Sequence, residues 1–323
     1  MQTHHSLTDL RSIPGPLHLA IGVFDGVHLG HQEVIRQAQD AAIQHGGTAV
    51  VVTFDPHPIR VVRPEHAPSL LTSTRHREII LARLGVMHLL EIPFTKEFAA
   101  NTAEQFVDLL REHSQPLGSI NVGSDWAFGR GRQGTLATLQ ELGARHGFMV
   151  NGAPRVCHGD EPISSTRIRH EVEEGDFLAV QNLLGRSYSV LGTVVKGRQL
   201  GRKIGFPTAN LAHLAEQLPP VGVYAVRARL DDTFLPAVAN LGYRPTVTDG
   251  ERERILEVHL LDFDQDIYGR ELEVKFVQRL REEMRLGSLE ELKAQIAMDT
   301  LQARRILTDA APAVSAVEDD LDS

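Results

Sequence analysis

The stretch LHLAIGVFDGVHLGH, residues 17–31, places an apolar run directly before a turn that holds three glycines, two histidines and one aspartate. The apolar part, residues 17–23, is typical of a buried strand. Beyond the turn, apolar residues recur with a helical period: Val34, Ile35, Ala38, Ala41 and Ala42. We therefore expect a strand, a glycine-rich turn and an amphipathic helix that begins near His31.

Three further apolar runs in the first half of the chain also predict buried strands: residues 48–54, 86–92 and 119–123. Thr102 and Gln105 have the spacing of a capping box, which predicts the start of another helix. Strands that alternate with helices indicate a parallel sheet with right-handed crossovers. Ligands of such sheets bind beyond the carboxyl ends of the strands, where GVFDGVHLGH and TFDPHP (residues 53–58) lie.

After about residue 186 the pattern changes to short β-rich runs separated by glycine and proline. This pattern predicts a compact antiparallel barrel. Ser288 and Glu291 have capping-box spacing, so we expect a final helix that extends to about Leu307. The predicted organisation is an α/β domain over residues 1–186, a barrel domain over residues 187–310 and an acidic tail over residues 311–323.

Composition limits the class of protein. A chain of 323 residues with 42% hydrophobic and 23% charged residues is globular and long enough for two domains. Its net charge of −9 argues against nucleic acid as the main partner. No run approaches the length of a membrane span, and the start lacks a signal-peptide pattern. We expect a cytoplasmic protein with small-molecule partners, and the oligomeric state stays open.

The single cysteine, Cys157, cannot form an internal disulfide, which fits a reducing compartment. We expect Cys157 to be a small buried residue.

The turn at residues 22–30 predicts an anion site, because the helix that follows directs its unpaired amide groups and its dipole at the turn. Its glycines allow a phosphate to approach the backbone. His28 and His31 add side-chain donors, and Asp25 is placed to orient one of them or the backbone. The helix dipole contributes about 1–2 kcal/mol, which is too little for catalysis alone.

Two other interpretations of these histidines are open. In the first, one histidine caps the helix and the other is simply exposed. In the second, both belong to a zinc site completed by Asp55 and His57. The spacing does not match the HExxH pattern of metalloproteases.

Four motifs occur in order over residues 22–169: GVFDGVHLGH, TFDPHP, GSDWAFGRGRQG (residues 123–134) and ISSTRIR (residues 163–169). Together they resemble the adenylyltransferase module of bacterial bifunctional riboflavin kinase/FAD synthetases. The resemblance implies a Rossmann-like nucleotidyltransferase domain that adenylylates FMN with ATP and releases pyrophosphate. It implies that His28 and His31 hold the ATP phosphates and stabilise the leaving pyrophosphate.

The resemblance also implies further ligand contacts in this domain. The predicted phosphate-binding residues are Gly22, Asp25, Gly30, Ser164, Ser165, Thr166 and Arg169. The predicted flavin-binding residues are Phe24, Phe54, Asp125 and Phe128, for whose aromatic rings ordinary core packing is the alternative. Trp126 stands where the family usually has Phe, which keeps a large aromatic ring but changes its fit.

A second group of motifs resembles the riboflavin kinase module of the same family: GTVVKGRQLGRKIGFPTANL (residues 192–211), PPVGVYAV (219–226), NLGYRPTV (240–247) and LEVHLLDFDQDIYG (256–269). The first of these does not match the usual GxxxxGK[ST] phosphate loop. Thr208 and Asn210 place two oxygen ligands on one side of an extended segment, as Mg²⁺ prefers.

The kinase resemblance implies that Thr208 and Asn210 bind Mg²⁺ with the ATP phosphates, near Gly197, Gly201 and Lys203. Phosphorylation of a neutral ribityl hydroxyl requires a carboxylate that accepts its proton, and Glu257 is the candidate base. A solvent-facing strand position is the alternative for this glutamate. Leu286 follows Arg285 where the family has a Lys-Phe pair, so flavin stacking by that aromatic is absent.

The expected substrates are therefore riboflavin, FMN and ATP, with Mg²⁺ in both steps. Two other functions fit part of the pattern. One is a non-catalytic flavin-binding regulator, and the other is an HxGH adenylyltransferase of another substrate class fused to an unrelated barrel.

Overall fold

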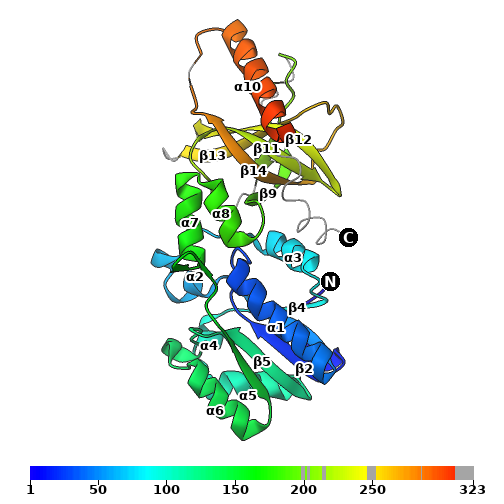
Figure 1. Ribbon diagram of the computed structural model, residues 1–323, viewed down its shortest axis with the longest axis vertical. Coiled ribbons are helices and arrows are strands. Elements are labelled where there is room, and N and C mark those ends of the chain that lie inside the picture. The colour runs from blue at the N-terminus through cyan, green and yellow to red at the C-terminus, as the bar shows by residue number, and fades with distance from the viewer. Residues whose placement is uncertain (198–200, 202–203, 213–215, 246–251, 285, 310–323) are drawn as a thin grey trace. The chain divides into compact units, whose positions relative to one another are not determined.

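A computed structural model of the chain describes residues 1–197, 201, 204–212, 216–245, 252–284 and 286–309. It divides into two compact units. The sheet unit contains Met1–Leu70 and Thr74–Ser165, and the barrel unit contains Leu71–Ser73 and the chain from Thr166 onward. Figure 1 shows the elements of both units.

The sheet unit is built on six parallel strands in the order β1-β4-β3-β2-β5-β6. The strands are β1 (Gln2–His4), β2 (Leu17–Ile21), β3 (Thr48–Asp55), β4 (His88–Pro93), β5 (Leu117–Gly123) and β6 (Met149–Ala153). The helices are α1 (Leu29–His45), α2 (Pro58–Val62), α3 (Thr74–Arg83), α4 (Lys96–Ala99), α5 (Ala103–His113) and α6 (Leu136–His146). Short 3₁₀ turns are η1 (Leu7–Ser12), η2 (Pro64–His66) and η3 (Arg130–Arg132).

Apolar side chains cover both faces of this sheet. On one face Ala20 and Val51 pack with residues of α1 and α3, and on the other Leu19 and Ile120 pack with residues of α5 and α6. The predicted parallel sheet is confirmed, as are its four predicted strands. The capping box of Thr102 and Gln105 at the start of α5 is also present.

The barrel unit is a closed antiparallel barrel in the order β10-β13-β12-β11-β14-β9. Its strands are β9 (Ser189–Val195), β10 (Ala209–Ala212), β11 (Gly222–Leu230), β12 (Thr233–Pro245), β13 (Arg252–Leu260) and β14 (Glu271–Arg281). Helix α10 (Leu289–Asp309) packs Ala303 and Leu307 against Val223, Ala225 and Val238 of the barrel. The predicted barrel with a final helix is confirmed.

The cap of α10 differs in one contact from the predicted capping box. Ser288 Oγ accepts a hydrogen bond from the Glu291 amide at 3.1 Å, as expected. The Glu291 carboxylate accepts from the amide of Gly287 at 2.8 Å, one residue before the cap.

Helices α7 (Ser165–Glu174) and α8 (Phe177–Leu184) follow the small hairpin of β7 (Cys157–His158) and β8 (Glu161–Pro162). In α8, Phe177 stacks on Phe276 of the barrel with centroids 5.4 Å apart. Both helices precede residue 186, yet from Thr166 onward the chain groups with the barrel unit. The predicted tail at residues 311–323 lies outside the described residues.

Cys157 corrects one expectation. Its side chain is exposed rather than buried, because β7 lies in a two-stranded hairpin at the surface. Among the residues that the structure describes, no helix is long and apolar enough to cross a membrane.

Candidate active sites

The turn between β2 and α1 has an unusual backbone. Phe24, Gly26 and Val27 have φ values of 53°, 81° and 41°. A side chain at such a φ is strained by about 1–3 kcal/mol and persists only where the surroundings fix it. The Phe24 and Val27 side chains are fully buried in the core between the sheet and α1, which supplies that fixation.

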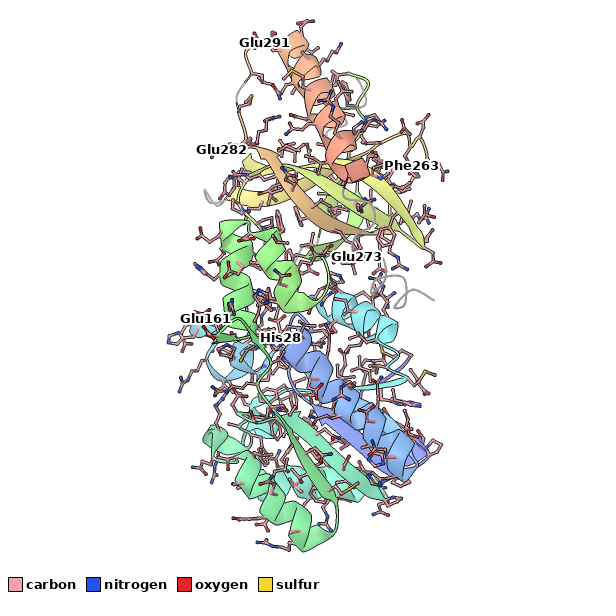
Figure 2. The ribbon with its side chains drawn as sticks, viewed as in Figure 1. His28, Glu161, Phe263, Glu273, Glu282 and Glu291 are labelled. Carbon is pink, nitrogen blue, oxygen red and sulfur yellow. The ribbon has the colours of Figure 1, made fainter. Side chains whose placement is uncertain are left out.

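His28 is the N-cap of α1, which begins at Leu29, two residues before the predicted start (Figure 2). Its Nδ1 accepts a hydrogen bond from the His31 amide at 3.3 Å. A neutral His28 ring that accepts at Nδ1 carries its proton on Nε2, which makes Nε2 a donor. The capping interpretation is therefore correct for His28.

His31 is not a merely exposed residue, because its ring is stacked on that of His28. The two centroids are 3.6 Å apart with an interplanar angle of 17°. The rings of Phe24 and His31 are nearly perpendicular, with centroids 5.3 Å apart. The sheet unit therefore holds two imidazoles in parallel at the N-terminus of α1.

Two of the predicted glycines, Gly30 and Gly22, lie close to the rings of His28 and Phe24. A Cβ at Gly30 would lie 3.2 Å from His28 Cε1 and Nδ1, and a Cβ at Gly22 would lie 3.1 Å from the Phe24 ring. Both distances are shorter than ordinary van der Waals contact, so a side chain at either position would shift an aromatic ring of the turn.

The third and fourth motifs contribute differently. Ser165 Oγ donates to the backbone oxygen of Asp25 at 2.9 Å, which ties ISSTRIR to the turn of GVFDGVHLGH within the sheet unit. Ser164 directly precedes α7, whereas Thr166 and Arg169 lie on that helix in the barrel unit. The Asp25 side chain is buried beside the turn.

The predicted flavin contacts fall into two groups. Phe24 is 0% exposed and packs in the core next to the turn, which favours the alternative of ordinary core packing for its ring; its contact with the flavin stays a prediction. Phe54 and Phe128 are nearly buried in the opposite core. The partly buried Trp126 covers one face of Phe128, with centroids 4.5 Å apart and planes 9° from parallel.

Asp125 is exposed, and its carboxylate lies 3.6 Å from Nε of Arg155. It therefore lies on the surface of the loop that follows β5, next to the stacked Trp126.

The residues proposed to complete a zinc site have other partners. Asp55 Oδ1 accepts from the Thr74 hydroxyl at 2.9 Å, and His57 Nδ1 accepts from the Ile59 amide at 3.2 Å. Within the described residues, no group of three or more His, Cys, Asp or Glu side chains is arranged to hold a metal ion.

In the barrel unit, Glu257 lies in a continuous row of residues across neighbouring strands. It is paired in register with Asn210 of β10 on one side and with Asn240 of β12 on the other. Asn240 is opposite Val223 of β11, which is opposite Arg281 of β14. All five residues line one cavity of about 470 Å³, and Thr208 and Gly201 line it as well.

The glycine-rich segment packs closely on the predicted oxygen ligands. A Cβ at Gly197 would lie 2.4–2.6 Å from the amide atoms of Asn210, and a Cβ at Gly201 would lie 3.4 Å from Thr208 Oγ1. The backbone therefore forms a cradle around Thr208 and Asn210 that a side chain would fill. Lys203 lies outside the described residues.

A second cavity, of about 230 Å³, adjoins the first, since Thr208 lines both. Its other walls are mostly apolar and aromatic, and they include Val194, Leu260, Phe263, Ile267 and Tyr268. Three polar residues, Asp264, Gln265 and Asp266, also line it. Lys196 lies over the Tyr268 ring at 5.6 Å from its centroid.

Comparisons with known proteins find relatives for both parts of the chain. The FAD synthetase family model matches residues 11–167, and the riboflavin kinase family model matches residues 184–307. A curated bifunctional riboflavin kinase/FMN adenylyltransferase of Escherichia coli strain K12 is 42% identical over 298 residues, which is 91% of this chain and 94% of the relative. The chain belongs to the bifunctional riboflavin kinase/FMN adenylyltransferase family.

Other relatives of this family cover a similar share. The Pseudomonas fluorescens protein of the same name is 38% identical and covers 96% of this chain and 99% of the relative. A crystal structure titled as a macrolide-efflux protein from Streptococcus pneumoniae is 32% identical, with a TM-score of 0.80 over 94% of this chain and 99% of that one.

Several residues that line the large cavity could not be predicted from the sequence motifs. Asn240 belongs to the motif NLGYRPTV, but only the strand register places it beside Glu257. Arg281 and Asp299 form a bidentate ion pair in the cavity wall, at 2.8 Å between Nη2 and Oδ2. Leu286, which replaces the family's aromatic, also lines this cavity.

Proposed function

We propose that the barrel unit transfers the γ-phosphoryl group of ATP to riboflavin and that the sheet unit transfers the adenylyl group of a second ATP to FMN. The observation that carries this proposal is the position of Glu257, which lies between Asn210 and Asn240 in a cavity large enough for a flavin. The stacked imidazoles at the N-terminus of α1 supply the second, separate site.

In the kinase reaction, Glu257 accepts the proton of the ribityl hydroxyl as the hydroxyl oxygen bonds to the γ-phosphorus and the bond to ADP breaks. The larger cavity binds the flavin, and the smaller one binds the nucleotide base against Phe263 and Tyr268. Because Thr208 lines both cavities, the phosphates lie at their junction, within reach of the base.

The glycine cradle fits a hard cation beside the phosphates. Thr208 Oγ1 and the Asn210 side-chain oxygen would hold Mg²⁺, which supplies charge neutralisation for the transferring phosphoryl group. The absence of a side chain at Gly197 leaves room for the Asn210 amide, because a Cβ there would lie 2.4–2.6 Å from its atoms. Lys203 and Gly201 are proposed to contact the same phosphates.

In the adenylyl transfer, the attacking phosphate of FMN is already an anion, so this step requires charge neutralisation and alignment rather than a base. His28 donates from Nε2, and His31 with the first amides of α1 adds positive potential where the pyrophosphate leaves. Ser164, Thr166 and Arg169 are proposed to bind the same phosphates. Phe54, Phe128 and Asp125 are proposed for the flavin side.

We propose residues 1–186 and 187–310 as the two functional modules, both in the cytoplasm. The presence of a single, exposed cysteine is consistent with a reducing compartment.

The test is to incubate the purified chain with riboflavin, ATP and Mg²⁺ and to separate the flavins over time. We expect FMN to appear before FAD, and FMN supplied alone to be converted to FAD. A flavin-binding regulator would bind flavin without product, and an adenylyltransferase of another substrate class would leave FMN unchanged.

A further inference from the structure

A buried ion pair lies beneath the turn that carries the two histidines. Arg77 of α3 and Glu91 of β4 meet at 2.8 Å between Nη2 and Oε1, with side chains that are 6% and 5% exposed. Their neighbours along the chain on this side of the sheet, Ile80, Leu81 and Leu89, belong to the apolar core that also contains Phe24 and Val27. Two charges are therefore embedded in the same core that supports the turn.

This pair is connected to the backbone of the turn through one carbonyl group. Arg77 Nη1 donates to the Val23 oxygen at 3.4 Å, and Thr53 Oγ1 donates to the same oxygen at 3.0 Å. Thr53 is the register partner of Glu91 on the adjacent strand. Arg77 of α3, which is paired with Glu91 of β4, and Thr53 of β3 thus both bind the carbonyl of Val23. Val23 directly precedes Phe24, the first residue of the turn with a positive φ.

The pair is not explained by stability. Removing two charges from water costs several kcal/mol, and apolar replacements of whole buried ion pairs are often neutral or stabilising. An apolar pair would, however, lose the donor to Val23. The guanidinium of Arg77 donates from Nη2 to the Glu91 carboxylate and from Nη1 to the Val23 carbonyl. Because the guanidinium is planar and rigid, it fixes the distance between the Glu91 carboxylate on β4 and the Val23 carbonyl at the turn.

We propose that Arg77 and Glu91 are positioning residues for FMN adenylylation: they hold the Val23 carbonyl, and through the rigid turn they fix where His28 and His31 stand. This inference rests on the proposed function of the sheet unit. Neither side chain touches substrate in this role. A displacement of the turn by about 1 Å is expected to cost about 10²-fold in rate, as for other misplaced catalytic groups.

The test uses three variants of the full chain. Arg77→Met/Glu91→Leu removes both charges together, so that no unpaired charge stays buried and the protein folds. Arg77→Lys keeps the positive charge next to Glu91 but lacks the second arm of the fork. Arg111→Met is the matched control, because Arg111 lies on α5 in an exposed pair with Asp108 at 3.0 Å.

For the double variant we expect kcat of FAD formation from FMN to fall about 10²-fold, with kcat/KM falling in parallel. Arg77→Lys is expected to unfold at the wild-type temperature yet to lose activity in the same direction. Riboflavin phosphorylation by the barrel unit is expected to stay at the wild-type rate in all variants, and the control is expected to retain both activities.

If the double variant and Arg77→Lys both adenylylate FMN at the wild-type rate, the positioning role is wrong, although the proposed function stands. If the wild-type chain makes no FAD from FMN, the proposed function itself fails, and this inference fails with it. Equal loss of both activities in a folded double variant would show a general structural role and would also overturn the inference.

Discussion

Glu257→Gln separates general-base catalysis from binding in the barrel unit. Glutamine has the size of glutamate and leaves the backbone pairing of β13 with β10 and β12 unchanged. Its amide still donates or accepts a hydrogen bond to the ribityl hydroxyl, but it cannot take the proton. We therefore expect KM for riboflavin to change little while kcat of FMN formation falls.

The magnitude follows from the role. A positioned base contributes about 10²–10⁴ in rate, which corresponds to about 3–5 kcal/mol of transition-state stabilisation. Glu257 stands on a strand of a closed barrel, paired in register with Asn210 and Asn240, rather than on a loop, so the backbone that carries the base is held in place. We expect a loss in the upper part of this range.

The assay is the initial rate of FMN formation from riboflavin, ATP and Mg²⁺, with FAD formation from supplied FMN measured on the same preparation. Asp232→Asn is the matched control, because this carboxylate is 98% exposed at the turn between β11 and β12. A Glu257→Gln variant that makes FMN at the wild-type rate would refute the assignment of Glu257 as the base.

Three further changes test the rest of the site. His28→Asn keeps an N-cap for α1 but removes the imidazole donor, so FAD formation should fall by about 10² or more while FMN formation is retained, as product separation will show. Gly197→Ala places a Cβ within 2.4 Å of Asn210 and should slow riboflavin phosphorylation, measured against adenylylation of supplied FMN as the internal control. Burial raises the pKa of Glu91 above its usual range although Arg77 opposes the shift, so the folded state of Arg77→Met favours the protonated acid. Its melting temperature relative to Arg77→Met/Glu91→Leu should therefore be highest at low pH and fall as pH rises through that raised pKa; a pH-independent difference would contradict this.

Local patterns were sufficient for the elements that carry strong apolar periodicity. The run at residues 17–23 contains β2, which is buried on both faces as a continuous apolar run predicts, and the helical repeat in α1 marks the one face of that helix that is buried. Strands β1 and β6 escaped prediction since QTH and MVNGA hold few apolar residues. They are strands because β4 and β5 offer them parallel partners, which is information from distant parts of the chain.

The sites could be predicted where the reaction requires a particular type of side chain. His28 and Glu257 are predicted from what phosphate transfer requires, and their roles stay predictions. For Phe24 the sequence could not decide between core packing and flavin contact, because no pattern of neighbouring residues indicates a φ of 53° with the ring buried. Asn240 needed the strand register, which fixes the pairing only after the barrel closes.

The two units meet different chemical demands with different kinds of rigidity. The kinase nucleophile is neutral and requires a base, and the proposed base, Glu257, lies on a strand with hydrogen-bonded neighbours on both sides. The adenylylation nucleophile is already charged, and its site is a strained turn held by side chains from other elements, such as Arg77. Backbone pairing tolerates side-chain substitution, whereas a turn fixed by side chains does not. Substitutions far from either site should therefore reduce FAD formation more often than FMN formation, because the geometry of the turn depends on more of the sequence.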